Sequence, residues 1–162
     1  MISLNNHIQE YNIQLEKGHI QKAYKGIMIF MSGLNSYLAK KHLDFISSSL
    51  YFGYMDMTYF AFTPLELRNK KLKIAIVYLH IEGRFEVWFC GANRKIQSEY
   101  IDLLRNKNVV KYRLSQIKPG VDPIVESILV EVPDFDHPDE LMMQIEHKTI
   151  EFVQDIVAIL AG

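Results

Sequence analysis

The sequence predicts an α+β fold: a single domain over residues 1–162, in which a mostly antiparallel sheet of about five strands packs with N- and C-terminal helices. Three observations support this prediction. Apolar residues recur every three to four positions near both ends of the chain, which is typical of amphipathic helices. Aromatic and β-branched residues dominate the middle of the chain. A short loop ending in Gly83 joins two of these middle runs and indicates an antiparallel hairpin.

The composition and charge exclude several classes of protein. The chain has 162 residues, of which 49% are hydrophobic and 23% charged, a globular composition that argues against intrinsic disorder. Eighteen Lys and Arg stand against nineteen Asp and Glu, for a formal net charge of -1. This near balance argues against nucleic acid as a partner and against a polybasic membrane binder. The single Cys90 cannot form an internal disulfide.

The location of the protein is predicted from features near its start and from its apolar runs. Residues 1–6, MISLNN, lack the basic start and apolar core of a secretory signal. Apolar runs such as residues 27–31 are much shorter than the roughly twenty residues that span a bilayer. Together with the lone cysteine, these features predict a cytoplasmic protein with no membrane contact.

The first two elements are predicted helices. Residues 3–17 form the first, with Ser3 as its N-cap and Gly18 as its stop, and residues 19–42 form the second. Apolar side chains at helical spacing line one face of each: Leu4, Ile8, Tyr11 and Leu15 in the first, and Ile20, Ala23, Tyr24, Ile27, Met31, Leu34 and Leu38 in the second. We expect both stripes to pack on a core.

The middle of the chain predicts three strands and one short helix. Residues 50–62 are rich in aromatic and β-favouring side chains and predict one long strand. Thr63 and Pro64 then supply a cap and a first helical position for a short helix within 64–71. Residues 72–81 and 84–91 are two more strands, joined by Glu82 and Gly83, because Gly adopts the positive φ that a tight turn requires.

The two-residue loop sets a register for this hairpin in which Ile81 faces Arg84. On the predicted core face, His80, Tyr78, Ile76 and Ile74 lie opposite Phe85, Val87, Phe89 and Gly91. On the other face, Leu79 pairs with Glu86, Val77 with Trp88, and Ala75 with Cys90. Because this second face mixes apolar and charged side chains, it predicts either partial cover by another element or a binding surface.

The remaining elements alternate between helix and strand. Asn93 caps a predicted helix over 94–107, whose apolar side carries Ile96, Tyr100, Leu103 and Leu104. A short edge strand follows at 109–114, then an exposed loop at 118–123 and a strand at 124–132. The last element is a helix over about 138–160, with Leu141, Ile145, Phe152, Ile156 and Ile159 on its buried side.

Most catalytic and metal-binding motifs do not occur in the sequence. No two of the six histidines lie at the spacing of ligands on one helix, and one cysteine excludes thiolate zinc sites. A G-x-S-x-G elbow and a phosphate-binding loop are also lacking. We therefore predict no catalytic residue and no cofactor.

Asp56 is the unusual residue of the strand predicted at 50–62, because a carboxylate among aromatic rings needs a partner. The candidates for this partner are Arg84, Lys73 and Arg68. With Glu86, Asp56 resembles the paired acids by which nucleases of the PD-(D/E)xK type hold a divalent cation, Mg²⁺ or Mn²⁺. That family has Lys two residues after the second acid, whereas this chain has Trp88, so the resemblance implies at most a degenerate site.

Three segments resemble a small family of uncharacterised bacterial proteins that has no assigned activity. They are YFGYMDMTYF at 51–60, LKIAIVY at 72–78 and RFEVWF at 84–89. More distantly, the order of elements from Lys73 to the C-terminus is similar to an uncharacterised domain attached to nuclease-like and restriction-associated proteins. The first resemblance covers most of the chain and implies no functional residues. The second implies a link to nucleic-acid processing.

Three hypotheses follow for the function. The first is a non-catalytic module that binds a protein partner or small-molecule ligand through the mixed face, at Leu79, Arg84, Glu86 and Trp88, with Asp56 as a further binding residue. The second is a divalent-metal phosphodiesterase or its degenerate descendant, with Asp56 and Glu86 as ligands. The third is a homodimer that buries the Trp88 face.

Overall fold

The sheet is the centre of the structure, a computed structural model that describes residues 1–107, 109 and 111–162. Its elements, in chain order, are α1 (Leu4–Lys17), α2 (His19–Lys41), β1 (Phe45–Ser47), β2 (Met57–Pro64), α3 (Leu65–Arg68), β3 (Leu72–Leu79), β4 (Arg84–Gly91), α4 (Arg94–Arg105), β5 (Arg113–Leu114), β6 (Val125–Val130) and α5 (Pro138–Ala161). The strands form one sheet in the order β1-β2-β3-β4-β6-β5, and every pairing is antiparallel. The predicted α+β fold is therefore confirmed, with six strands where about five were expected.

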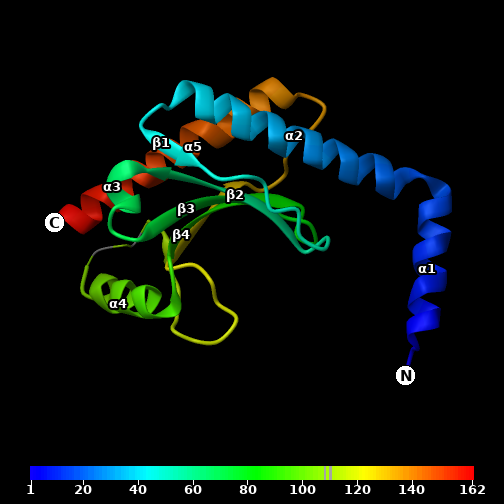
Figure 1. Cartoon of the computed structure of the whole chain (residues 1–162), viewed down its shortest axis with the longest axis horizontal. Coiled ribbons are helices and arrows are strands. Elements are labelled where there is room, and N and C mark those ends of the chain that lie inside the picture. Colours follow the sequence, from blue (N-terminus) through cyan, green and yellow to red (C-terminus); the bar gives the residue numbers. More distant parts are fainter. Residues whose placement is uncertain (108, 110) are drawn as a thin grey trace.

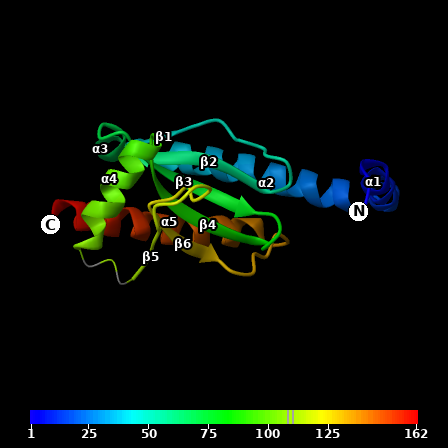
Figure 2. The ribbon, with the colours of Figure 1, turned by 90° about the horizontal axis from the view of Figure 1, so that it is seen from below.

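The core lies between one face of the sheet and two long helices. Figures 1 and 2 show α2 and α5 side by side over the same face, while α4 lies at one end of the sheet on the side away from α2. Most of the largest fully buried side chains come from the sheet and from these helices: Phe60, Phe62, Ile74, Ile76, Phe85, Phe89, Met31, Leu34, Leu38 and Phe152, to which α3 adds Leu67 and α4 adds Ile101. Burial of such side chains contributes about 1.5–3 kcal/mol each, so this layer stabilises the fold.

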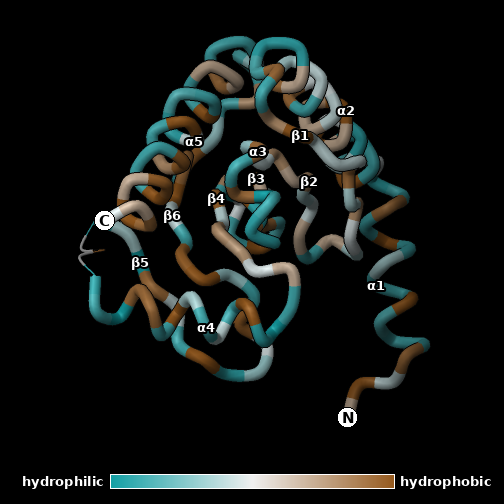
Figure 3. Tube along the Cα trace, turned by 60° about the vertical axis from the view of Figure 1, so that its left-hand side comes forward, coloured by the Kyte–Doolittle hydropathy of each residue, from teal (hydrophilic) through white to brown (hydrophobic). Residues whose placement is uncertain are grey.

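Helix α1 has the predicted ends but not the predicted packing. Ser3 accepts a hydrogen bond from the Asn6 N–H in a capping box, and Gly18 ends the helix with a left-handed φ of 82°. No residue of α1 is buried. Leu4, Ile8 and Tyr11 of its apolar stripe are exposed and Leu15 is half-buried, and Figure 3 shows α1 standing away from the sheet. In α2, only the half that follows Ile27 reaches the core, because α1 and the start of α2 extend beyond the sheet.

The prediction of one long strand over 50–62 was wrong, because the chain reverses within this segment. Gly53 and Met55 have positive φ values of 75° and 64°, and the reversal brings Tyr51 opposite Tyr59 in an isolated bridge. Only the part from Met57 onward is strand β2. The short strand β1, which pairs with the end of β2, was not predicted. Composition alone could not show the turn, since aromatic residues occupy both of its arms.

The β3–β4 hairpin has a longer loop than predicted. The turn closes with a hydrogen bond from the Gly83 N–H to the Leu79 carbonyl, 2.8 Å, so that Leu79, and not Ile81, faces Arg84. The register is thus displaced by two residues. Because two residues are one full period of a strand, each side chain still points to the face predicted for it. The core face and the mixed face were therefore correct, although the cross-strand pairs were not.

The C-terminal half follows the prediction with small differences. Asn93 caps α4 through a hydrogen bond from the Ile96 N–H, but the buried side of α4 is Gln97, Ile101 and Leu104, whereas Leu103 is exposed. Strand β5 forms the sheet edge within the predicted 109–114, of which residue 110 lies outside the described residues. The final helix α5 begins and ends within one residue of its predicted bounds. None of the helices among the described residues has the length and apolar character needed to cross a membrane.

A buried carboxylate joins the two helices that cover the core. Glu146 of α5 is hydrogen-bonded to His42 Nε2 at 2.6 Å, Tyr37 Oη at 2.9 Å and Lys41 Nζ at 3.1 Å, all at the end of α2. Burial by itself would raise the pKa of Glu146, but the hydrogen bonds from these three donors outweigh it and lower the pKa below its ordinary value of 4.5. The ionised form is thus stabilised in the folded state.

We predict that Glu146→Gln lowers the free energy of unfolding by about 1–3 kcal/mol at neutral pH, because its donors lose a charged acceptor. A lowered folded-state pKa stabilises the protein above the unfolded pKa, near 4.5, and this contribution is lost as the pH falls through the folded value. The difference between wild type and variant should therefore shrink below about pH 4.5 in urea unfolding curves. Glu151→Gln, an exposed acid on the same helix, is the control. A difference that is the same at pH 4 and pH 7 would contradict the assignment.

Candidate functional site

The face of the sheet opposite α2 and α5 carries the candidate site. We call it the mixed face, and it consists of the alternate residues Met57, Tyr59 and Ala61 of β2, Lys73, Ala75, Val77 and Leu79 of β3, and Arg84, Glu86, Trp88 and Cys90 of β4. Their neighbours along each strand point into the core. Because side chains alternate strictly along a strand, the apolar core pattern determines which residues appear on this face.

Glu86 is the fixed polar group of the mixed face. Its side chain is 5% exposed and accepts hydrogen bonds from Arg84 Nε at 2.7 Å and from Trp88 Nε1 at 2.9 Å. A buried carboxylate is stable only when charged or polar donors surround it, and these two donors meet that need. The same bonds hold the Trp88 indole in one orientation. Arg84 has a second acidic neighbour in Glu131, at 3.7 Å.

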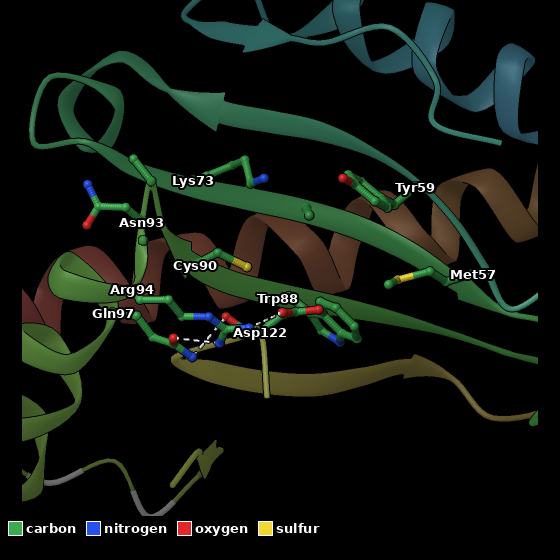
Figure 4. A pocket seen from close by; sticks show the side chains of 12 residues that line it. Met57, Tyr59, Lys73, Trp88, Cys90, Asn93, Arg94, Gln97 and Asp122 are labelled. Atoms are coloured by element: carbon green, nitrogen blue, oxygen red, sulfur yellow. Dashed lines mark hydrogen bonds and ion pairs between the residues drawn. The ribbon is translucent and has the colours of Figure 1, made fainter. Parts of the chain in front are cut away.

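Next to Trp88 lies a cavity of about 330 Å³, which Figure 4 shows from close by. Small residues form its floor, namely Ala75, Cys90, Gly91 and Ala92. Tyr59 and Trp88 are the aromatic rings beside this floor. The full lining is Met57, Tyr59, Lys73, Ala75, Trp88, Cys90, Gly91, Ala92, Asn93, Arg94, Gln97 and Asp122. Small residues between large rings thus create the hollow.

Two cations line this cavity. The ammonium of Lys73 lies 5.6 Å from the centre of the Tyr59 ring, a distance typical of a cation–π contact. Arg94, in the first turn of α4, forms an ion pair with Asp122 at 3.0 Å. Since the Arg94 charge is balanced by Asp122, the Lys73 ammonium gives this end of the mixed face its positive character.

The first turn of α4 closes one end of the cavity and is held there by close packing. A Cβ on Gly91 would lie 2.7 Å from the backbone nitrogen of Gln97, so only glycine permits this approach. Gln97 Nε2 donates to the Val121 carbonyl at 2.7 Å and to the Asp122 carbonyl at 3.2 Å. Arg94 also donates to the Val121 carbonyl. The end of the predicted 118–123 loop is therefore fixed against α4.

The structure places four of the five predicted binding residues on the mixed face. Leu79, Arg84, Glu86 and Trp88 share it, but only Trp88 lines the cavity described above. Arg84 and Glu86 instead border a separate hollow of about 300 Å³ near β5 and β6. These four predicted residues thus share one face, and the cavity lies nearer to α4 than three of them do.

Asp56, the fifth predicted binding residue, does not lie on the mixed face. It lies in the turn before β2, where its Oδ1 accepts a hydrogen bond from the Tyr54 N–H at 2.9 Å, and this bond lowers the pKa of its carboxyl. Among the described residues it forms no ion pair with the predicted partners Arg84, Lys73 and Arg68. Strand β3 separates it from Glu86, and two strand spacings amount to about 10 Å between backbones. The predicted Asp56 position on a strand was wrong, because the carboxylate stabilises a turn.

The two predicted metal ligands, Asp56 and Glu86, therefore do not face a common metal site in the structure. Glu86 is engaged by Arg84 and Trp88, and Asp56 by its own turn. No group of three or more His, Cys, Asp or Glu side chains that could hold a metal ion occurs in the part of the chain that the structure describes. The geometry gives no support to Mg²⁺ or Mn²⁺ at these acids.

The sequence prediction left the cavity residues Tyr59, Arg94 and Gln97 out of the candidate site. Tyr59 was hidden because the strand containing it was predicted too long, so its face was not determined. Lys73 was not among the predicted binding residues, although its alternation with Ala75 and Val77 already placed it on the mixed face. Arg94 bonds to Asp122 and Gln97 to Val121, 28 and 24 residues away in the sequence, and no local pattern could show these contacts.

Cys90 also borders the cavity, but its chemistry is not that of a nucleophile. The side chain is buried, and burial raises the pKa of the Cys90 thiol to about 12. The thiolate is the reactive form of cysteine, so the population available at neutral pH is very small. Cys90 serves as a small residue of the cavity floor.

Comparison with known proteins assigns the chain to a family. A family described as a domain of unknown function (DUF7000) matches residues 4–160, so the chain belongs to that family. No curated protein and no solved structure matches the chain significantly. The predicted resemblance to a family without an assigned activity is thus confirmed, while the match does not extend to nuclease- or restriction-associated proteins.

We predict that Glu86→Ala frees the Trp88 ring. Loss of the two hydrogen bonds to a charged acceptor should lower the free energy of unfolding by about 1.5–3 kcal/mol and increase quenching of Trp88 fluorescence by acrylamide. Glu131→Ala, which removes the more distant acid near Arg84, is the matched control and should change neither quantity measurably. Equal quenching in wild type and Glu86→Ala would contradict the anchoring role.

We also predict that Cys90 is inert in the native protein. With its pKa raised to about 12 by burial, the thiol should react with a disulfide reagent only after unfolding. The measurement is the thiol titre at pH 8 with and without urea. Complete modification of the folded protein within the time that the unfolded chain requires would show that the thiol is accessible.

Proposed function

We propose that this member of the DUF7000 family is a non-catalytic binding module, and that it takes a small, ring-bearing anion into the cavity between Tyr59, Trp88 and the first turn of α4. A single observation carries the proposal: two aromatic rings, a floor of small side chains and the Lys73 ammonium border the same hollow. Ligand sites combine apolar and aromatic walls with a few placed polar groups in this way.

The aromatic walls favour a planar group in the ligand. Trp88 is held by Glu86 and so loses little conformational freedom when it contacts a ligand. Tyr59 is partly exposed and lies on β2, the strand next to the one that carries Ala75. Ring stacking contributes about 0.5–1.5 kcal/mol per pair beyond area burial. A flat ligand is therefore favoured over an aliphatic one of equal size.

The charges favour an anion. Arg94 is paired with Asp122, but no salt bridge of Lys73 occurs among the described residues. An ammonium beside a cavity wall binds an anionic group more strongly than a neutral one, because the wall limits solvent screening. The carboxylate nearest on the mixed face, Glu86, is already engaged by Arg84 and Trp88.

The lining supports binding without chemistry. General acid–base catalysis needs a group whose pKa lies near the working pH, and burial moves the pKa of Cys90 to about 12, far from that range. The phosphodiesterase hypothesis is not put forward, since Asp56 and Glu86 lie on opposite sides of β3 and each is engaged elsewhere.

The experiment follows calorimetric binding and thermal unfolding with two matched pairs of probes: phenyl phosphate against phenol, and indole-3-acetate against indole-3-acetamide. The charged member of each pair should bind and raise the melting temperature, because a ligand that binds only the native state stabilises it. Lys73→Gln should weaken binding about tenfold, the loss of one charge-assisted hydrogen bond.

Two variants test whether the cavity is the site. Ala75→Leu adds side-chain volume to the floor and should abolish binding, whereas Lys70→Gln, a nearby exposed cation that does not line the cavity, should bind as wild type. Sedimentation of the free protein tests the homodimer that would bury the Trp88 face. Equal binding of charged and neutral probes, or of wild type and Ala75→Leu, would overturn the proposal.

A further inference from the structure

A second hollow continues from the cavity across Lys73. It measures about 540 Å³ and is lined by Ile46, Ser47, Ser48, Ala61, Thr63, Arg68, Lys71, Leu72, Lys73 and Ala92. Lys73 and Ala92 belong to both linings, so the two hollows adjoin. We call this second hollow the basic shelf, because its charged lining residues are Arg68, Lys71 and Lys73, all of them cations.

The cations of the basic shelf have no acidic partners among the residues that the structure describes. Residues 68–73 read RNKKLK, with four cations and no acid. None of the salt bridges found within the described part of the chain involves Arg68, Lys71 or Lys73. Like charges grouped in this way repel one another, so they destabilise the chain slightly unless an anion is bound. The group is notable in a chain whose formal net charge is -1.

The backbone at Lys71 adds an independent observation. Lys71 has a φ of 60°, in the left-handed region that favours glycine, and its carbonyl accepts a hydrogen bond from the Ala92 N–H at 2.9 Å. A non-glycine residue in this conformation is strained, and such outliers cluster at binding sites. The Ala92 bond fixes this turn directly beside the start of α4, so Lys71 is held at the hollow by the main chain.

Building on the proposed function, we propose that the ligand is a nucleoside phosphate whose base stacks at Tyr59 and Trp88 and whose phosphates extend over Lys73 onto the basic shelf. A single carboxylate is neutralised by one cation and leaves Arg68 and Lys71 without a role. A chain of phosphates carries several charges and can engage all three cations. Bases of any kind present a flat face to aromatic side chains.

The order of groups along the sheet fits this chemistry. Tyr59 lies beside Lys73 through the cation–π contact of 5.6 Å, and Lys73 borders both hollows. The aromatic walls therefore lie on one side of Lys73, and Arg68 and Lys71 on the other. A nucleoside phosphate has the same order, with the base at one end and the phosphates at the other. Asn93, Arg94 and Gln97 at the start of α4 lie at the Lys73 side of the cavity, away from Tyr59 (Figure 4).

The experiment is a calorimetric titration of wild type with ATP, adenosine, pyrophosphate and a single-stranded oligothymidylate at about 0.15 M salt, where interactions between distant charges are screened. ATP should bind at least tenfold more tightly than adenosine or pyrophosphate, since only ATP engages both hollows. Arg68→Gln combined with Lys71→Gln should weaken ATP about tenfold or more and leave adenosine unchanged.

Two further variants separate binding from folding. Lys70→Gln removes an exposed cation that does not line the basic shelf, and it should bind ATP within twofold of wild type. Lys71→Gly suits the left-handed backbone and should retain the melting temperature while weakening ATP. If Lys70→Gln weakens ATP as much as Lys71→Gly does, general charge explains binding and the proposal is overturned.

The remaining outcomes distinguish this inference from the proposed function. Binding of phenyl phosphate or indole-3-acetate without tighter binding of ATP or the oligothymidylate overturns the nucleoside phosphate and leaves the small-anion site in place. Failure of every probe overturns both. Preference for the oligothymidylate over ATP, with the same sensitivity to Lys71→Gly, supports the same chemistry with the nucleotide supplied by a strand.

Discussion

The structure depends on the packing of α2 and α5 onto a single face of the sheet. Phe60, Ile76 and Phe85 are fully buried beneath these helices, and the strands that carry them must direct every other residue to the opposite face. With two helices over one face and none over the middle of the other, the second face is available for a ligand. Its small residues, Ala61 and Ala75, lie where a fully covered sheet would carry large apolar side chains.

Two buried carboxylates act on opposite sides of this sheet. Glu146 joins the two covering helices through three donors, and Glu86 holds Arg84 and Trp88 on the mixed face. In each case the cost of burying the carboxylate is offset by several hydrogen bonds from one short stretch of chain. The first network therefore fixes the core layer, and the second fixes an aromatic ring at the cavity. We expect the free energy of unfolding to fall strongly when either acid is removed and only weakly when an exposed neighbouring acid is removed.

Local signals predicted the elements well, and long-range contacts explain the errors. Ser3, Gly18 and Asn93 mark helix ends through their own hydrogen bonds or φ, so their roles could be read from the sequence. The faces of β3 and β4 were correct because alternation survives a two-residue displacement of register. The reversal at Gly53 was missed because rings occupy both arms of the turn. The cavity was missed because its lining combines residues of β2, β3, β4, α4 and the 118–123 loop, and sequence spacing does not show which of these lie together.

The net charge was the least informative of the sequence observations, because it averages over segregated charges. Residues 68–73 carry four cations and no acid, whereas residues 131–140 carry five acids and no Lys or Arg: Glu131, Asp134, Asp136, Asp139 and Glu140. These segments nearly cancel in the sum, yet the acidic segment follows β6 and begins α5, while the basic segment follows α3 and begins β3. Electrostatic potential at a surface is determined by charges within about one Debye length, roughly 8 Å at physiological salt. A balanced composition therefore excludes a uniformly basic surface but leaves room for a local anion site, and the basic shelf is such a place.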